Sequence, residues 1–309
     1  MPEGPEVQTI VNDLNRKIIG RRIIGVWTDW PKMITLRQAQ SNGEPSRTIK
    51  TGAKAFEREI KSAKIKGVRR WGKNILIDLD KDRLLLIHQK MTGHLLVGKW
   101  KIEKVTRNRQ QATSLTKGPL QERVNDFIRL IFYLDNGQML ALSDMRRFAK
   151  VLFGKTKDIE NLKELKNLGV DPIDPKTTFK DFAAAIAKRT RNIKQVLMDQ
   201  TVISGVGNIY ADDILWFTKI HPLKRANNLT DRELKNIWLA TRSILKKAIK
   251  LRGTSTADFR DTAGKKGGYG NVVLAYRRTG LPCHRCKTLI KRIKIGGRSS
   301  HFCPKCQKI

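Results

Sequence analysis

The first seven residues of the chain, MPEGPEV, place a secondary amine beside two carboxylates. We expect Met1 to be removed because a small residue follows it, which would leave Pro2 with a free amine. A neutral secondary amine can attack an electrophilic carbon and form an iminium, and Glu3 could then move protons as a general acid or base. The alternative is that the prolines only begin a helix, with Glu3 and Glu6 complementing its dipole. These residues alone leave both interpretations open.

The four cysteines lie near the C-terminus as Cys283-x-x-Cys286 and Cys303-x-x-Cys306. Four thiolates at this spacing match a closed, tetrahedral structural zinc site, and in a cytosolic chain they favour a metal over disulfides. The segment between the two pairs contains a glycine turn flanked by strand-like residues, which predicts a β-hairpin. Arg298 would project from its tip toward a phosphate, or would simply be a solvated charge.

Four further segments carry side chains suited to a nucleic acid. Lys73 lies in a basic run just before a predicted strand, and Asn208 follows two glycines at the start of a predicted helix, where exposed amides suit a phosphate. Met91, and Arg146 with Phe148, follow other strands and offer apolar wedges beside cations, as enzymes that extrude a nucleotide require. The alternatives are core packing for Met91 and Phe148, and an ordinary helix connection around Asn208.

Composition supports a polyanionic partner. The 309 residues include 63 Lys plus Arg against 28 Asp plus Glu, a formal net charge of +35. Such an excess attracts phosphates and releases their counterions, so nucleic acid is favoured. An anionic membrane is the competing partner, but there is no long apolar run, and the acidic N-terminus is unlike a signal peptide. We therefore expect a cytoplasmic protein without a membrane partner.

The elements that must position these residues fall into two parts. The first residues open an amphipathic helix, and residues 22–150 then show strand patterns with hairpins at 74–88 and 127–142, which predicts an all-β sandwich or barrel. Residues 101–125 are polar and aperiodic and are predicted to be a mobile loop. After a proline-containing segment, the apolar period becomes helical, with a capping box at 230–233, so the second part begins as a helical bundle.

Taken in order, these motifs resemble the bacterial formamidopyrimidine-DNA glycosylases, which excise oxidised purines. The resemblance covers essentially the whole chain through PEGPE, RRWGK, MTG, DMRRF, LMDQ before GVGNIY, and GGRSSHFCPKCQ. It implies an α+β multidomain fold with one structural zinc ion, acting as a monomer on double-stranded DNA that contains oxidised bases or abasic sites. The implied parts are a catalytic β-sandwich flanked by helices at 1–153, a linker or hinge at 154–178, a helix-two-turn-helix DNA-binding domain with a lesion-binding loop at 179–268, and a four-cysteine zinc finger at 269–309.

The resemblance also implies roles, by position, for individual residues. The amine of Pro2 would attack C1′ of the damaged nucleotide, Glu3 would protonate the sugar and later shuttle protons, and Glu6 would help to order the site. The base would leave first, and the strand would then be cut by β- and δ-elimination. The other implied contacts are Lys73, Asn208 and Arg298 on the phosphates flanking the lesion, Met91, Arg146 and Phe148 in the gap left by the extruded base, and Lys194 with residues 253–270 around the lesion.

Three positions depart from the family pattern. Gly4 stands where leucine is common, and Met145 and Ala149 stand where proline and glycine are usual. Glycine at position 4 is typical of the endonuclease-VIII-like branch, which acts on oxidised pyrimidines, so that activity is one alternative. A non-catalytic, zinc-containing nucleic-acid-binding protein is the other alternative, because such a protein would not need Pro2.

Overall fold

The computed structural model describes residues 1–38, 47–50, 52–106, 109–255 and 258–309. The chain divides into two units that each contain more than one segment. Unit 1 comprises Met1–Pro2, Glu6–Lys166 and Thr254–Gly267, and unit 2 comprises Glu3–Pro5, Asn167–Gly253 and Gly268–Ile309.

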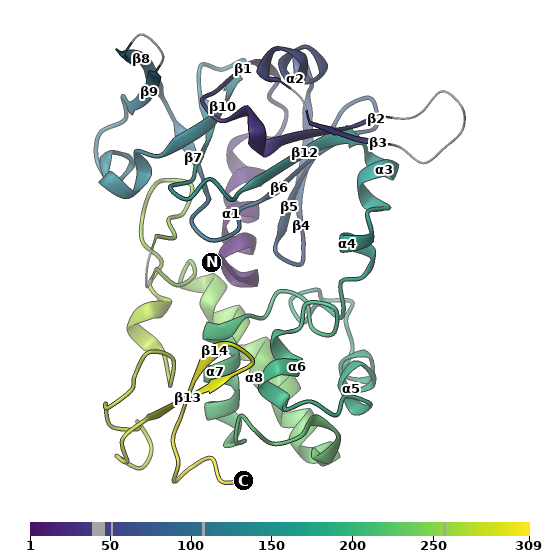
Figure 1. The fold of residues 1–309 in the computed structure, drawn as a ribbon, viewed down its shortest axis with the longest axis vertical. Helices are drawn as coiled ribbons and strands as arrows, with labels where there is room; N and C mark the ends of the chain where they lie inside the picture. Colours follow the sequence, from purple (N-terminus) through teal and green to yellow (C-terminus); the bar gives the residue numbers. More distant parts are fainter. Residues whose placement is uncertain (39–46, 51, 107–108, 256–257) are drawn as a thin grey trace. The chain divides into compact units, whose positions relative to one another are not determined.

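Unit 1 contains two sheets that share one apolar core (Figure 1). The first sheet has the order β1 (Ile23–Thr28), β10 (Ile128–Leu134), β11 (Met139–Ser143) and β7 (His94–Gly98). The second has the order β3 (Arg47–Lys50), β2 (Ile34–Gln38), β12 (Lys150–Lys155), β6 (Arg83–His88), β5 (Asn74–Leu79) and β4 (Ile65–Trp71). Neighbouring strands are antiparallel except for β2 and β12, which are parallel. The predicted β-sandwich is confirmed.

Two helices close this core. Helix α1 (Gly4–Lys17) buries the apolar series that predicted it, and those side chains join the same cluster as both sheets. Helix α2 (Ala53–Ile60) was not predicted from the sequence. Its Phe56 is fully buried and meets Phe132 of β10 and Phe153 of β12 edge to face, with ring centroids 6.1 Å and 5.9 Å apart. Aromatic pairing of this kind fixes α2 against both sheets.

The prediction of a loop at 101–125 was wrong. The segment forms a hairpin of β8 (Trp100–Thr106) and β9 (Arg109–Ser114), followed by the 3-10 turns η2 (Pro119–Gln121) and η3 (Arg123–Asn125). Among the described residues from 100 to 125, Trp100, Ala112 and Leu120 are the buried apolar ones, and they pack in a small cluster with residues of β7, β10 and β11. So few anchors leave no readable period in the sequence. Residues 107–108 lie outside the described residues.

The segment predicted to be a linker, 154–178, contains the two short helices α3 (Thr156–Glu160) and α4 (Lys163–Lys166), which belong to unit 1.

The predicted lesion-binding loop, 253–270, also supplies residues to unit 1, because Thr254–Gly267 belongs to that unit. Thr262 donates a hydrogen bond from its hydroxyl to Asp13 of α1 (2.9 Å) and accepts one at its carbonyl from Val97 of β7 (2.8 Å). Residues 256–257 of that loop lie outside the described residues.

Unit 2 is organised around helix α7 (Asn208–Thr218), which packs against α6 (Ile193–Met198), α8 (Asp231–Lys250) and strand β14 (Arg298–Phe302) (Figure 1). The remaining elements of this unit are α5 (Phe179–Ala187), η4 (Ala226–Asn228), η5 (Tyr269–Val272) and β13 (Lys291–Ile295). The capping box predicted at 230–233 is confirmed, since Thr230 and Glu233 cap α8 reciprocally. The predicted hairpin between the cysteine pairs is also confirmed, as β13 and β14.

None of the helices in the described parts of the chain combines the length and apolar character that crossing a lipid bilayer requires.

Candidate active site

Glu3 lies at the N-terminus of α7. Its Oε1 accepts a hydrogen bond from the backbone N–H of Ile209 at 3.0 Å, and its side chain is 4% exposed. The residue that precedes α7 is Gly207, which has no side chain to cap the helix. The carboxylate of Glu3 therefore serves as the cap, where the helix dipole favours a negative charge. A Cβ at position 207 would stand 2.3 Å from Cδ of Glu3, so glycine is needed for this approach.

Gly4 fits against the turn that leads into α7. Its N–H donates to the carbonyl of Gly205 at 2.7 Å, and Gly205 adopts the left-handed conformation, with φ +86°. Gln200 holds the same turn from within, because its amide donates to the carbonyl of Val206 (2.7 Å) and accepts from the N–H of Gly205 (3.0 Å). A Cβ at position 4 would lie 3.0 Å from the carbonyl oxygen of Gly205 and 2.9 Å from Ile173. Leucine there would require the turn to move.

Pro2 belongs to unit 1, and its side chain is buried. Met1 is attached to it in the structure, so a free amine requires cleavage of that peptide bond. Glu6 is also buried, at 1% exposed, and its Oε1 accepts a hydrogen bond from the N–H of Thr254 at 2.7 Å. Glu6 thus fixes the beginning of segment 254–267 to α1, which is consistent with a supporting role.

Lys73 lies with Gly72 in the two-residue turn that joins β4 to β5, where Gly72 has φ +59°. Its side chain is 7% exposed. Burial, followed by the charges of Lys90, Lys73 and Lys150, lowers the pKa of His88 to about 3. His88 is therefore neutral at pH 7 and lies among ammonium groups, an arrangement that suits a phosphate. No motif in the sequence selects His88, because only Lys90 is close to it in the chain, whereas Lys73 and Lys150 are brought to it by the fold.

Met91, Arg146 and Phe148, the predicted wedge residues, lie on two turns. The carboxylate of Asp144 joins these turns. Asp144 is buried and accepts hydrogen bonds from the hydroxyl of Thr92 and from the N–H groups of Arg146 (3.2 Å) and Ala149 (2.7 Å). Thr92 directly follows Met91, so Asp144 brings the two turns together. The sequence analysis assigned no role to Asp144, although an aspartate at the start of a turn often accepts backbone N–H groups in this way.

The wedge side chains themselves are exposed. Met91 is 37% exposed and Phe148 is 49% exposed, so the alternative that they are core residues is wrong. The guanidinium of Arg146 lies 4.7 Å from the ring centroid of Phe148, within range of a cation–π interaction. Met145, on the same turn, is also exposed. Ala149 is buried and is held by its N–H on Asp144.

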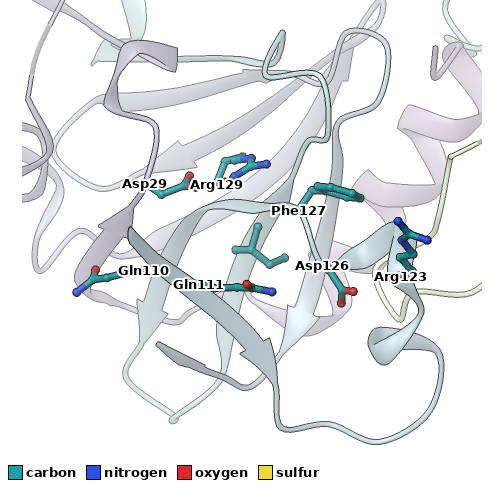
Figure 2. Close-up of a pocket in the computed structure, with 8 residues that line it drawn as sticks. Asp29, Gln110, Gln111, Arg123, Asp126, Phe127 and Arg129 are labelled. Carbon is teal, nitrogen blue, oxygen red and sulfur yellow. Dashed lines mark hydrogen bonds and ion pairs between the residues drawn. The ribbon is translucent and has the colours of Figure 1, made fainter. Parts of the chain in front are cut away.

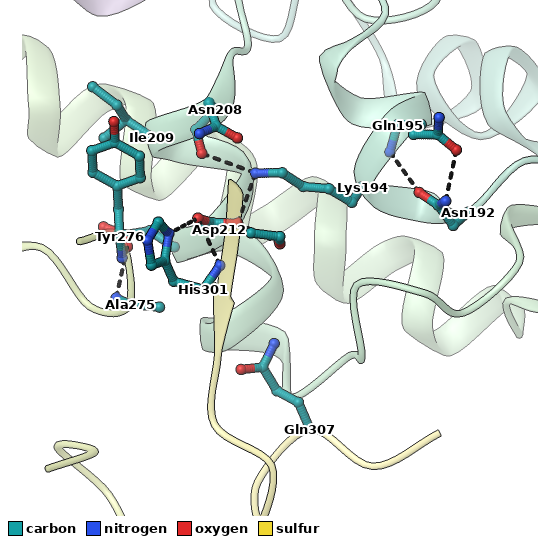
Figure 3. A network of polar contacts seen from close by, with 12 residues as sticks. Asn192, Lys194, Gln195, Asn208, Ile209, Asp212, Ala275, Tyr276, His301 and Gln307 are labelled. Atoms are coloured by element: carbon teal, nitrogen blue, oxygen red, sulfur yellow. Dashed lines mark hydrogen bonds and ion pairs between the residues drawn. The ribbon is translucent and has the colours of Figure 1, made fainter. Parts of the chain in front are cut away.

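Lys194 is buried inside unit 2 and is 1% exposed (Figure 3). Its ammonium donates to Oδ1 of Asp212 at 2.7 Å and to the carbonyl of Asn208 at 2.9 Å. Asn208 itself is half-buried at the first position of α7, and among the described residues its Oδ1 has no hydrogen-bond partner. Lys194 and Asn208 are therefore brought together, but through the backbone of Asn208. A direct contact between Lys194 and a lesion stays a prediction.

A second carboxylate of α7 holds the segment before the zinc-binding region. Asp213 accepts hydrogen bonds from the hydroxyl of Tyr269 (2.8 Å) and from the N–H groups of Leu274 (3.1 Å) and Ala275 (2.9 Å), while burial raises the pKa of Asp213. Burial also raises the pKa of Tyr276, and the negative charge of Glu3 acts in the same direction. Tyr276 is thus a candidate site residue that the sequence analysis missed.

The four cysteines form one cluster in which all four sulfur atoms lie within 4.8 Å of one another. Two of the sulfur pairs, Cys286 with Cys303 and Cys286 with Cys306, are 3.4 Å apart. A tetrahedral zinc ion with Zn–S bonds near 2.3 Å needs sulfur separations of about 3.8 Å, so the cluster fits one ion after small adjustments. A hydrogen bond with the Thr288 side chain lowers the pKa of Cys286 to about 6, which favours the thiolate that zinc binds.

Arg298 is exposed at the start of β14, immediately after two glycines with φ +52° and +77°. The hairpin therefore presents Arg298 at its tip, as the sequence predicted.

A cavity of about 260 Å³ lies elsewhere in unit 1 (Figure 2). Its lining includes Asp29, Arg129 and Phe127, and none of the predicted site residues. Asp29 and Arg129 form an ion pair of 2.6 Å, and Nε of Arg129 also donates to the carbonyl of Asp144 (3.2 Å). Arg129, which lines the cavity, thus holds the backbone at the start of the wedge turn.

Three family models together match most of the chain. Residues 1–151 match the formamidopyrimidine-DNA glycosylase N-terminal domain, residues 168–260 the formamidopyrimidine-DNA glycosylase H2TH domain, and residues 280–309 a zinc finger found in FPG and IleRS. Among curated proteins, the chain is 35% identical over 309 residues to a formamidopyrimidine-DNA glycosylase of Pelotomaculum thermopropionicum, covering 100% of both chains. It is 33% identical over 308 residues to that of Herpetosiphon aurantiacus, covering 99% of this chain and 100% of the relative.

Solved structures give the same result. The Lactococcus lactis Fpg in complex with abasic-site DNA matches with a TM-score of 0.81 at 28% identity, covering 99% of this chain and 100% of that one. A complex of the same bacterium's Fpg with DNA containing an oxidised pyrimidine matches with a TM-score of 0.80 at 28% identity, covering 100% of both chains.

Proposed function

Since the chain belongs to the formamidopyrimidine-DNA glycosylase family, we propose that it removes oxidised purines through a covalent intermediate on Pro2. As a member of that family, it is a DNA glycosylase of base excision repair with the lyase activity that is general to the family. The observation that carries this proposal is the placement of Glu3, the residue bonded to Pro2, as the cap of α7. A carboxylate held at a helix N-terminus is oriented and has little freedom to leave. It is suited to moving protons next to the amine.

In the proposed reaction, the nitrogen of Pro2, freed from Met1, attacks C1′. The glycosidic bond breaks, and the base leaves with the bonding electrons and takes up a proton. The Pro2 nitrogen loses its proton, Glu3 protonates the ring oxygen O4′, and the C1′–O4′ bond breaks, so that the sugar ring opens and an iminium forms between Pro2 and C1′. The iminium acidifies the C2′ proton, so β-elimination releases the 3′ phosphate and δ-elimination releases the 5′ phosphate. Water then hydrolyses the remaining iminium and frees the amine of Pro2.

We propose that Lys73, Asn208 and Arg298 bind the phosphates beside the lesion, and that Met91, Arg146 and Phe148 fill the space of the extruded nucleotide. The exposure of the wedge side chains supports this assignment, because an inserted group must be free to reach the base stack. The net charge of +35 supports phosphate-dominated docking. By analogy with the relatives solved with abasic-site and lesion-containing DNA, the substrate is damaged duplex DNA.

One structural zinc ion belongs to the four-cysteine cluster. When bound, it crosslinks the two ends of the hairpin segment. Cys283, Cys286, Cys303 and Cys306 would hold it, and no chemical step is assigned to it. We further propose that the protein works as a monomer in the bacterial cytoplasm, where the DNA is.

Borohydride trapping on abasic-site DNA tests the covalent mechanism. The mature protein is expected to form an adduct whose peptide carries the DNA at Pro2. A version with an N-terminal extension that retains Met1 is the matched control, because it keeps every side chain but acylates the amine. Equal trapping by the extended protein would contradict the mechanism.

A panel of duplexes, each with one oxidised purine or pyrimidine, tests the substrate. Faster cleavage of the purine lesions is expected. Faster cleavage of the pyrimidine lesions would instead support the endonuclease-VIII-like alternative, which Gly4 favours. Binding without any cleavage would support a non-catalytic role.

A further inference from the structure

We infer that Asp212 is a positioning residue that fixes the two proposed phosphate ligands of unit 2, Asn208 and Arg298, as one clamp. The inference rests on the proposed function in so far as these two residues bind DNA. It assigns Lys194 to the interior of the clamp as the cation that links Asp212 to Asn208.

The carboxylate of Asp212 is fully buried and accepts hydrogen bonds from four donors (Figure 3). Oδ1 accepts from the ammonium of Lys194 (2.7 Å) and from the hydroxyl of Ser300 (2.8 Å). Oδ2 accepts from the backbone N–H of His301 (3.0 Å) and lies 2.7 Å from its Nδ1. One side chain thus joins α6, α7 and β14, and both of its oxygens are fully used.

The link to Arg298 runs along β14. Side chains alternate between the two faces of a strand, so Arg298 and Ser300 emerge on the same face. Ser300 is bonded to Asp212, so this anchor lies two residues from Arg298. A two-stranded hairpin has little stability of its own. Gly296 and Gly297 at its tip increase the conformational freedom of the turn. Because Asp212 accepts hydrogen bonds from two consecutive residues of β14, Ser300 and His301, the position of the Arg298 guanidinium is restricted.

The link to Asn208 runs through Lys194. The ammonium donates to the carbonyl of Asn208 at 2.9 Å while it pairs with Asp212. Asn208 and Asp212 are four residues apart and lie on the same face of α7. Removing the carboxylate would leave the Lys194 charge buried without its ion-pair partner, which is costly. We expect the N-terminal turn of α7 and the hairpin tip to lose their fixed separation.

The test measures the affinity for a duplex with a tetrahydrofuran abasic analogue, which cannot be cleaved through C1′, over a series of salt concentrations. The variants are Asp212→Asn, Arg298→Ala and the double variant. Asp181→Asn is the matched control, because it causes the same charge change at an exposed cap of α5 in the same unit. Thermal unfolding and bound zinc are measured for each protein.

Asp212→Asn is expected to raise Kd about tenfold and to reduce the slope of log Kd against log salt by about one, the amount due to one phosphate contact. The double variant should raise Kd by less than the product of the two single increases, because both changes remove the Arg298 contact and only the Asn208 contact is lost in addition. Asp181→Asn should leave the slope unchanged. Losses that multiply in the double variant, or a lower Tm with unchanged Kd and slope, would overturn the inference.

If Asp212→Asn does not fold, Ser300→Ala takes its place in the same cycle. It should give no further loss with Arg298→Ala, because Ser300 anchors only the Arg298 side of the clamp. The affinity measurement needs no chemistry at Pro2. A failure of borohydride trapping would therefore contradict the proposed mechanism without affecting the clamp, and an unchanged salt slope would contradict the clamp without affecting trapping.

Discussion

The two units of the protein hold their predicted functional residues in different ways. In unit 1, the wedge residues stand exposed on turns at the edge of a large apolar core. Asp144 holds those turns through the hydroxyl of Thr92 and two backbone N–H groups, and not through the wedge side chains. In unit 2, Glu3, Lys194 and Asn208 are tied to α7 by buried charges and hydrogen bonds.

In unit 1, the wedge residues can therefore act on DNA without contributing to the stability of the fold. In unit 2, the residues of the site also hold the fold together. An exposed side chain on a rigid turn can be replaced without disturbing the core, and its effects should add to those of distant changes. A buried polar network depends on every member, because one missing partner leaves others unsatisfied. We therefore expect substitutions of the exposed wedge residues in unit 1 to change activity alone, and those in the buried network on α7 in unit 2 to act on neighbouring site residues as well.

The largest effect is expected from Gly207→Ala. The new Cβ would collide with the carboxyl of Glu3, which can move because it is the end of a side chain. The cap on α7 is then lost while the fold is kept. Loss of an oriented proton-transfer group predicts a fall of about a hundredfold in the single-turnover rate of abasic-site cleavage. Gly268→Ala is the control, since its Cβ would meet only the carbonyl of Leu251 at 3.6 Å. An unchanged rate in Gly207→Ala would remove Glu3 from the mechanism.

Removal of zinc should have the next largest effect. Without the metal, the hairpin loses the crosslink between its two ends, and the contact of Arg298 with a phosphate is lost. A hydrogen bond to a charged group contributes about 1.5–3 kcal/mol, which predicts a rise in Kd of roughly tenfold to a hundredfold. Chelation followed by fluorescence anisotropy with abasic-analogue DNA measures this, and added zinc should restore binding. If full affinity persists in metal-free protein, the hairpin does not depend on zinc for its position.

Phe148→Ala tests the separation of fold from function in unit 1. Because the ring is exposed, the free energy of unfolding should change by less than about 0.5 kcal/mol. Loss of stacking on a base, about 1–3 kcal/mol, predicts a rate of lesion excision lower by roughly tenfold or more. Leu115→Ala, which truncates another exposed apolar side chain of unit 1, should change neither quantity. A strongly destabilised Phe148→Ala protein would show that unit 1 also couples its site to its core.

The same difference explains what could be read from the sequence. Chemistry that depends on local spacing was predictable: the cysteine pairs indicated the metal cluster and its hairpin, and the apolar series after Gly4 indicated α1. Interactions between distant residues were not. Nothing in the sequence pairs Asp212 with β14, or Asp144 with Thr92, because a buried carboxylate is defined by donors that the fold brings to it. Lys194 was assigned by position in a motif, which gives no information on burial.

The surroundings of two histidines differ in the same way between the units. His301 in unit 2 lies against the carboxylate of Asp212, whereas His88 in unit 1 lies near lysines, and the pKa of His88 is lowered to about 3. In the unfolded state, where the pKa of histidine is near 6.5, His88 binds a proton as the pH falls below 6.5, whereas in the folded state it stays neutral. The contribution of His88 to the free energy of unfolding is therefore present above pH 6.5 and is lost as the pH falls. As the pH falls from 7.5 to 6.0, this effect of His88 should lower the free energy of unfolding by about 0.8 kcal/mol. Urea unfolding of the whole protein should show this decrease, and His88→Gln should remove that part of it while leaving the parts due to other histidines. An equal decrease in the variant would mean that His88 can be protonated in the folded protein.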